Sequence, residues 1–202
     1  MTAIDTDHVL TVLGAESWAE AEQRRADVAA RLALIVYDGH VRDQGTPYLE
    51  HPLGVVALLR DEIGADDADT LVLALLHDAL EVAPESSELL AWHLGVGFTT
   101  RLRSMTPDHR LEERPKCPPD EFGWRAKQAG LPPGLLLVRL ADRVHNLRDL
   151  VPGSARRERF LDALRDFYLP LADEAADRTP HLAALRTLLH AEYDRHRQEP
   201  RP

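Results

Sequence analysis

The sequence LVLALLHDALEV, residues 71–82, joins an unbroken apolar run to a histidine and two acids. The apolar part, residues 71–76, has no polar face, which predicts a helix surrounded by protein on most sides. On one continuous helix, His77, Asp78 and Glu81 would project to the same side. This stretch therefore predicts a buried helix that ends beside a polar pocket.

The acids of this stretch need a partner if they are buried. An isolated buried carboxylate costs more free energy than a marginally stable protein can spare, so buried carboxylates are paired or bind a metal. A neutral imidazole beside carboxylates suits a divalent ion such as Mn, Fe or Zn. The alternative is a His-Asp pair at a solvated helix end, and for an arbitrary His-Asp dipeptide it is the better interpretation. The apolar run before His77 favours the metal.

Composition indicates an ordinary globular chain of 202 residues, 44% hydrophobic and 29% charged. This length predicts one domain over residues 1–202, with a metal-site core at about 40–150 and helices at about 154–197 as structural cover. No apolar run is long enough to span a membrane, and the first residues lack the pattern of a signal peptide, so a cytoplasmic location is expected. The only cysteine, Cys117, cannot form an internal disulfide.

The formal charge of −10 and the lack of a long basic run oppose binding to nucleic acid. We expect neither a nucleic-acid nor a membrane partner, whereas a small polyanion can still bind where local arginines and a metal outweigh the overall field. The sequence gives no indication of oligomeric state.

Hydrophobic periodicity and Gly/Pro punctuation predict helices throughout. A capping box of Ser17 and Glu20 would start the first helix, which would end near Gly39, and Asp66 or Asp67 would cap the helix that leads to His77. Residues 106–119 are expected to form a loop, either a solvated connector or a lid that grips phosphate. The expected helices cover residues 16–40, 51–63, 71–82, 86–94, 98–105, 120–129, 134–150, 154–176 and 180–197.

Two further residues are candidate metal ligands. His51 stands at a helix start, one antiparallel helix away from His77, although a lone histidine before proline is usually only a polar turn residue. Asp142 shares a face with Asn146, opposite a leucine-rich stripe. The alternative for Asp142 is an ordinary amphipathic helix whose polar side chains lie in water.

Three motifs in order, GTPYLEHPLGVVALL at 45–59, LVLALLHDALE at 71–81 and LVRLADRVHNLRDL at 137–150, resemble the HD-domain hydrolases of the RelA/SpoT type. The likeness is greatest to the stand-alone small alarmone hydrolases. It implies an all-α HD-domain helical bundle around one Mn²⁺, or another divalent ion, held by His51, His77, Asp78 and Asp142. The implied substrate is guanosine tetra- or pentaphosphate, from which the 3′-pyrophosphate is removed to leave GDP or GTP.

The resemblance also implies roles for other residues. Glu81 would orient or deprotonate the attacking water. Arg42 would pack on the guanine base and Asn146 would contact the nucleoside. Tyr48 lies in the same turn as Arg42 and is either a further substrate contact or a core residue.

The chain departs from the family pattern at three places. Val82 stands where the family has a second acid, Asp43 stands where it commonly has a lysine, and residues 104–124 match its substrate-gripping segment poorly. Two other functions therefore stay open: an HD-type hydrolase of another nucleotide phosphate, or a non-catalytic module that senses a nucleotide.

Overall fold

The computed structural model describes residues 4–42, 44–151 and 154–198. The described residues form helices and turns and contain no strand; Val41 and Pro47 form an isolated β-bridge. The predicted all-α class is confirmed. The chain divides into two compact units, Met1–Leu131 and Pro132–Pro202. The prediction of a single domain over the whole chain stays a prediction.

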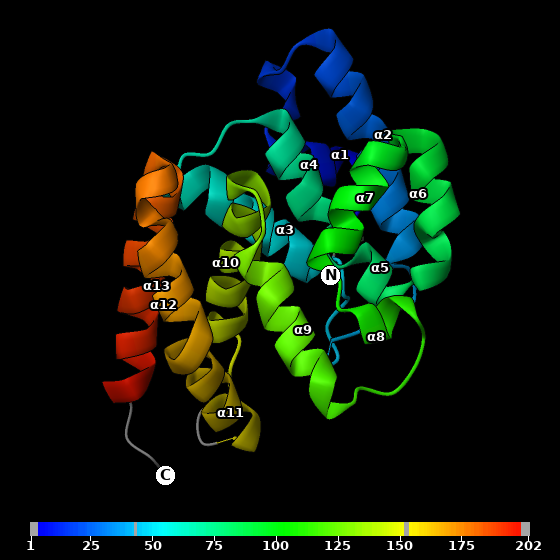
Figure 1. Cartoon of the computed structure of the whole chain (residues 1–202). Coiled ribbons are helices and arrows are strands. Elements are labelled where there is room, and N and C mark those ends of the chain that lie inside the picture. The colour runs from blue at the N-terminus through cyan, green and yellow to red at the C-terminus, as the bar shows by residue number, and fades with distance from the viewer. Residues whose placement is uncertain (1–3, 43, 152–153, 199–202) are drawn as a thin grey trace. The chain divides into compact units, whose positions relative to one another are not determined.

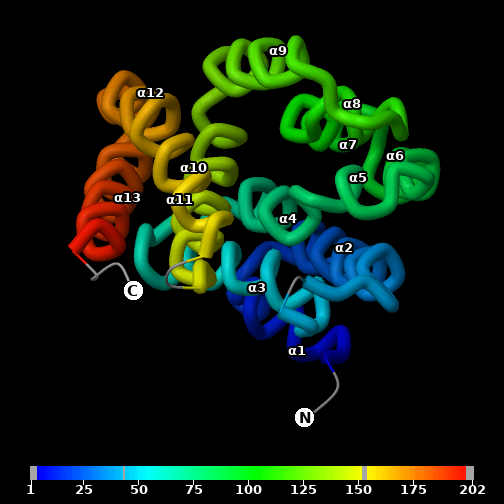
Figure 2. Tube along the Cα trace, turned by 90° about the horizontal axis from the view of Figure 1, so that it is seen from below, coloured from blue at the N-terminus to red at the C-terminus, as the bar shows by residue number. Residues whose placement is uncertain are grey.

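The first unit is built around α4, which packs against α2 and α3 (Figures 1 and 2). Residues 71–76 of α4 are all buried, as their unbroken apolar pattern predicts. The helices of this unit follow one another along the chain. In order they are α1 Thr6–Leu13, α2 Glu20–Val36, α3 Glu50–Ala57, α4 Ala68–Leu76, α5 Ala79–Val82, α6 Ser87–Leu94, α7 Val96–Met105, α8 Asp108–Leu111 and α9 Pro118–Ala129, with 3₁₀ turns at Ala15–Ser17 and Pro84–Ser86 and a π-helical turn at Leu58–Glu62.

Side-chain caps set the start of two helices. The carboxylate of Asp67 accepts the backbone N–H of Thr70 at 2.8 Å and starts α4, as predicted. The predicted capping box of Ser17 and Glu20 is wrong, because Ser17 belongs to a 3₁₀ turn and α2 begins at Glu20. The side chain of Glu22 instead accepts the backbone N–H of Ala19 at 3.1 Å.

The helix expected over residues 71–82 is broken. Its first part, α4, ends at Leu76, and α5 begins at Ala79. Asp78 has φ −98° and ψ 1°, which lies in the sparsely populated bridge region between helical and extended backbone. The prediction that His77 and Asp78 share one helical face is therefore wrong. A turn brings their side chains together.

The connection over residues 106–119 contains one short helix, α8, and leads into α9. Two of its cations, Arg114 and Lys116, are held by acids nearby. The guanidinium of Arg114 pairs with Asp120 at 2.7 Å, and the ammonium of Lys116 pairs with Glu121 at 2.8 Å. A lid would need these positive charges to bind phosphate, but here they are paired with carboxylates. The pairing therefore favours the interpretation of this segment as a connector.

The second unit is a small helical assembly of α10 Pro133–Arg148, α11 Ala155–Ala163, α12 Leu169–Ala175 and α13 Pro180–Gln198. A π-helical turn, Leu164–Tyr168, joins α11 to α12. Helix α13 packs along α10 and α12 (Figure 2). Its buried Glu192 binds the guanidinium of Arg148 on α10 at 2.7 Å. The helices predicted at 134–150, 154–176 and 180–197 thus fold together in one unit.

Within the described residues, no helix combines the length and apolar character that crossing a bilayer would require.

Candidate metal centre

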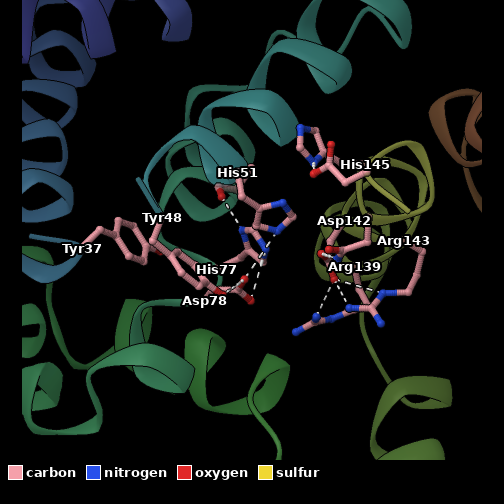
Figure 3. A network of polar contacts seen from close by, with 12 residues as sticks. Tyr37, Tyr48, His51, His77, Asp78, Arg139, Asp142, Arg143 and His145 are labelled. Atoms are coloured by element: carbon pink, nitrogen blue, oxygen red, sulfur yellow. Dashed lines mark hydrogen bonds and ion pairs between the residues drawn. The ribbon is translucent and has the colours of Figure 1, made fainter. Parts of the chain in front are cut away.

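Three predicted ligands of the first unit, His51, His77 and Asp78, converge in a buried cluster (Figure 3). One potential ligand atom from each lies within 4.8 Å of the others. The Nε2 atom of His51 is 3.5 Å from Oδ2 of Asp78, and Nε2 of His77 is 3.2 Å from Oδ1 of the same carboxylate. The single carboxylate therefore presents one oxygen to each imidazole.

A backbone carbonyl fixes the tautomer of His77. Its Nδ1 atom lies 2.7 Å from the carbonyl oxygen of Ala74. Because a carbonyl only accepts hydrogen bonds, Nδ1 must carry the proton, and in a neutral ring Nε2 presents its lone pair. This arrangement is the one that metal-binding histidines usually show.

The donor set fits a divalent cation. A lone pair on Nε2 of His77 faces a carboxylate oxygen of Asp78 at 3.2 Å, and two such acceptors repel each other unless a proton or a metal ion lies between them. A divalent ion would satisfy both imidazoles and the carboxylate together, and imidazole with carboxylate suits Mn, Fe and Zn.

The turn before α3 carries His51 to the end of α4. Within this turn the backbone N–H of Arg42 donates to Thr46 at 2.9 Å, and that of Tyr48 donates to His40 at 2.9 Å. Gly45 adopts a φ of +80°, which favours glycine. His51 then lies in the first turn of α3, and its ring meets that of His77 edge-on at 5.2 Å between centroids.

Two stacked tyrosines lie near Asp78. The hydroxyl of Tyr48 donates to Oδ2 of Asp78 at 3.0 Å, and its ring stacks on Tyr37 at 5.5 Å between centroids (Figure 3). Burial and the negative charge of Asp78 raise the pKa of both tyrosines, so that both hydroxyls remain donors. No pattern in the sequence singles out Tyr37, because its stacking partner lies on a different element.

Glu81 and Arg42 also lie in the first unit. Glu81 is half-buried on α5, and its charge contributes to the raised pKa of Tyr37 and Tyr48. Arg42 is half-buried in the turn before α3. Val82, which replaces an expected acid, is the last residue of α5. Asp43 lies outside the described residues.

In the second unit, Asp142 is buried on α10 and enclosed by donors. The guanidinium of Arg139 donates to Oδ2 at 2.7 Å, and Nε of Arg143 donates to the same oxygen at 3.1 Å (Figure 3). The side-chain amide of Asn146 donates to Oδ1. The alternative of a solvated Asp142 is therefore wrong. As a metal ligand Asp142 stays a prediction, and so does Asn146 as a substrate contact.

Comparison with known proteins agrees with this geometry. Residues 29–106 match the HD domain family. The chain is 35% identical over 109 residues to human guanosine-3′,5′-bis(diphosphate) 3′-pyrophosphohydrolase MESH1, an alignment that covers 53% of this chain and 58% of the human protein. It is 29% identical over 158 residues to the bifunctional (p)ppGpp synthase/hydrolase SpoT of Escherichia coli K12, covering 76% of this chain and 22% of SpoT.

A solved structure shows the same fold. It is that of a metazoan ortholog of SpoT described as hydrolysing ppGpp, and it matches with a TM-score of 0.64 at 24% identity, over 89% of this chain and 97% of that one. The predicted HD-domain helical bundle is thus confirmed. Residues 29–106, which carry His51, His77 and Asp78, match the HD domain family, and the resemblance to hydrolases of the RelA/SpoT type is confirmed.

Proposed function

We propose that this chain is a metal-dependent phosphohydrolase that removes the 3′-pyrophosphate of guanosine-3′,5′-bis(diphosphate), ppGpp. The observation that carries the proposal is the buried cluster of His51, His77 and Asp78 inside the segment that matches the HD domain family. Support for the substrate comes from relatives such as human MESH1, which bears the name of this activity, although the match covers 58% of its length. The products would be pyrophosphate and GDP, or GTP from the pentaphosphate.

The metal would be held by His51, His77, Asp78 and Asp142. Manganese is proposed on the resemblance, and other divalent ions suit the same donors. Such an ion lowers the pKa of a bound water and offsets negative charge on phosphate. The cytoplasmic location expected from the sequence belongs to the same proposal.

The chain's own side chains would bind and orient the reactants. The carboxylate of Glu81 would orient the attacking water or accept its proton. Arg42 and Asn146 would contact the guanosine part of the substrate. Tyr48 stays a predicted substrate contact. Its hydroxyl also donates a hydrogen bond to Asp78.

Val82 favours a second candidate, in which the same metal site acts on another nucleotide phosphate. The position ends α5, directly after Glu81, and offers no second acid. A module that binds a nucleotide without cleaving it would also tolerate valine there. Retaining buried charges that serve no purpose is costly, which disfavours this third interpretation.

The test is pyrophosphate release from ppGpp by the purified full chain, with Mn²⁺ and with a chelator, beside a panel of nucleoside mono-, di- and triphosphates. We expect release that requires the metal. Turnover of another nucleotide without turnover of ppGpp would replace the substrate. Tight ppGpp binding with no turnover under any divalent ion would instead indicate sensing.

The ligand set has its own test. We expect His77→Ala and Asp142→Ala each to lose bound metal and activity, measured by elemental analysis and by the same assay. The exposed His93 and Asp177 provide matched controls, His93→Ala and Asp177→Ala, which should retain both. Normal metal content in both ligand variants would refute this set.

A further inference from the structure

The hydroxyl of Tyr48 contacts an oxygen that also faces a histidine. Its donor lies 3.0 Å from Oδ2 of Asp78, and the same oxygen lies 3.5 Å from Nε2 of His51. The other oxygen, Oδ1, faces His77 at 3.2 Å. Rotation of the carboxylate would break the hydrogen bond from Tyr48. This bond therefore holds the plane of the carboxylate so that one oxygen faces each imidazole.

Tyr37 supports both Tyr48 and the backbone before the ligands. Its ring is buried and stacks on that of Tyr48, with 15° between the ring planes. Its hydroxyl donates to the carbonyl of Leu75 at 3.3 Å. Leu75 belongs to the last turn of α4, where carbonyls lack partners in the regular helical ladder.

The two tyrosines thus contact the region of the break between α4 and α5 at two points. Tyr37 binds the backbone at Leu75, before the break, and Tyr48 binds the side chain of Asp78, within it. The two rings come from different elements, because Tyr37 follows α2 and Tyr48 precedes α3. The stack therefore joins the end of α2 and the start of α3 to the ligand-bearing turn.

We infer that Tyr48 is a positioning residue for Asp78, and that Tyr37 supports it through the ring stack and through Leu75. This assignment rests on the proposed metal site. It gives Tyr48 a role different from substrate contact, since its hydroxyl is directed at a ligand oxygen. Partners of this kind, outside the ligands themselves, orient a ligand and commonly change metal affinity when they are removed.

Tyr48→Phe tests the inference, because phenylalanine keeps the ring stack and removes only the hydroxyl. We expect Mn²⁺ to bind ~10-fold more weakly, measured by calorimetric titration of the metal-free variant without nucleotide. A circular dichroism spectrum identical to that of the wild type shows that the variant is folded. At saturating Mn²⁺ the KM for ppGpp should equal that of the wild type.

Two matched controls accompany it. Tyr37→Phe keeps the stack and the bond from Tyr48 to Asp78 and removes only the bond to Leu75, so we expect a smaller loss of Mn²⁺ affinity than in Tyr48→Phe. Tyr193→Phe alters a buried tyrosine of the second unit and should change neither metal affinity nor KM.

Unchanged Mn²⁺ affinity in Tyr48→Phe would overturn the inference. Unchanged affinity together with a raised KM for ppGpp would indicate that Tyr48 contacts the substrate instead. The outcome is separable from the proposed function. If the wild type binds Mn²⁺ and Tyr48→Phe binds it more weakly, the inference stands even where ppGpp is not hydrolysed. If the wild type binds no divalent metal, the inference fails.

Discussion

The imidazole of His77 already has the tautomer and the orientation that metal binding would require. The carbonyl oxygen of Ala74, one turn earlier in the chain, accepts the hydrogen bond of Nδ1 at 2.7 Å between the nitrogen and the oxygen, so the ring would have neither to rotate nor to change tautomer on binding. Ordering a side chain is a cost that binding must otherwise overcome. A ring already fixed by the backbone therefore binds metal more tightly than a free one would.

Glu81 provides the sharpest prediction at the scale of single residues. Glutamine keeps the shape of its side chain and removes the ability to accept a proton. We expect Glu81→Gln to retain bound metal while turnover falls by ~10²–10⁴-fold, the usual contribution of a general base. The measurement is metal content together with kcat for ppGpp.

The exposed Glu85 supplies the control, since Glu85→Gln changes the same functional group four residues later, in the next turn of the chain, and should leave kcat unchanged. Wild-type turnover by Glu81→Gln would show that another group orients or deprotonates the attacking water.

The candidate ligands could be chosen from the sequence because their residue types suit a metal and because they lie in three motifs that occur in a recognisable order along the chain. Their geometry could not. Periodicity assumes an unbroken helix, and the chain breaks at His77 and Asp78, where Tyr37 and Tyr48, some thirty to forty residues earlier in the chain, make their contacts. The donors around Asp142 were also hidden, because Arg139 and Arg143 look like surface residues of an amphipathic helix.

At the scale of elements, α4 is joined to its neighbours by one carboxylate in its first turn. Asp69 binds the guanidinium of Arg25 on α2 at 2.9 Å and that of Arg101 on α7 at 2.9 Å. Both arginines also lie over the ring of Phe98, at 5.3 and 5.5 Å from its centroid. The cluster links α2, α4 and α7 at the polar end of an otherwise apolar helix.

This cluster predicts a dependence of stability on pH. Hydrogen bonds from Arg101, and the charge of both arginines, lower the pKa of Asp69 below its usual range. Its contribution is thus fully present above the unfolded carboxyl pKa of about 3.9 and is lost as the pH falls through the lower folded pKa. We expect Asp69→Asn to reduce the free energy of unfolding at pH 7 by ~1 kcal/mol, as for partly exposed ion pairs.

Urea unfolding at pH 7 and pH 3 measures this effect, and the difference between variant and wild type should shrink at the lower pH. Asp66→Asn, at an exposed position nearby, is the control and should match the wild type at both values. A difference that persists undiminished at pH 3 would assign the loss to packing and not to charge.

Most helices could be predicted because glycine, proline and periodicity mark them. Gly95 separates α6 from α7 with a φ of +91°, and Pro118 starts α9, close to the predicted boundaries. Periodicity does not reveal α1, a helix of 8 residues whose start is capped by the carboxylate of Asp5, which accepts the backbone N–H of His8 at 2.9 Å. An element of that length has too few turns for periodicity to detect, so only its cap could have revealed it.

At the scale of the whole molecule, the proposed metal should act as a stabilising ligand. An ion that binds only the folded chain adds about 2.7 kcal/mol at a concentration 100 times its Kd. For a chain of this length that corresponds to a rise in Tm of roughly 5–10 °C. Thermal unfolding with excess Mn²⁺ and with chelator measures the shift.

His77→Ala is the matched variant, because it removes one ligand, and its Tm should respond little to Mn²⁺. His93→Ala, at an exposed position, should respond as the wild type does. Equal shifts in all three proteins would mean that the ion stabilises the chain from somewhere other than the His51, His77 and Asp78 cluster.

The continuous burial of α4 has a consequence for the chain before it folds. Residues 71–76 form an uncharged apolar hexapeptide without proline, the composition that promotes aggregation of nascent or damaged chains. Charged residues flank it closely on both sides: Asp66, Asp67 and Asp69 before it, Asp78 and Glu81 after it. Residues in these positions act as gatekeepers that oppose intermolecular β-pairing. Replacing Asp69 or Asp78 by an uncharged residue should therefore also lower the amount of protein that escapes aggregation during synthesis.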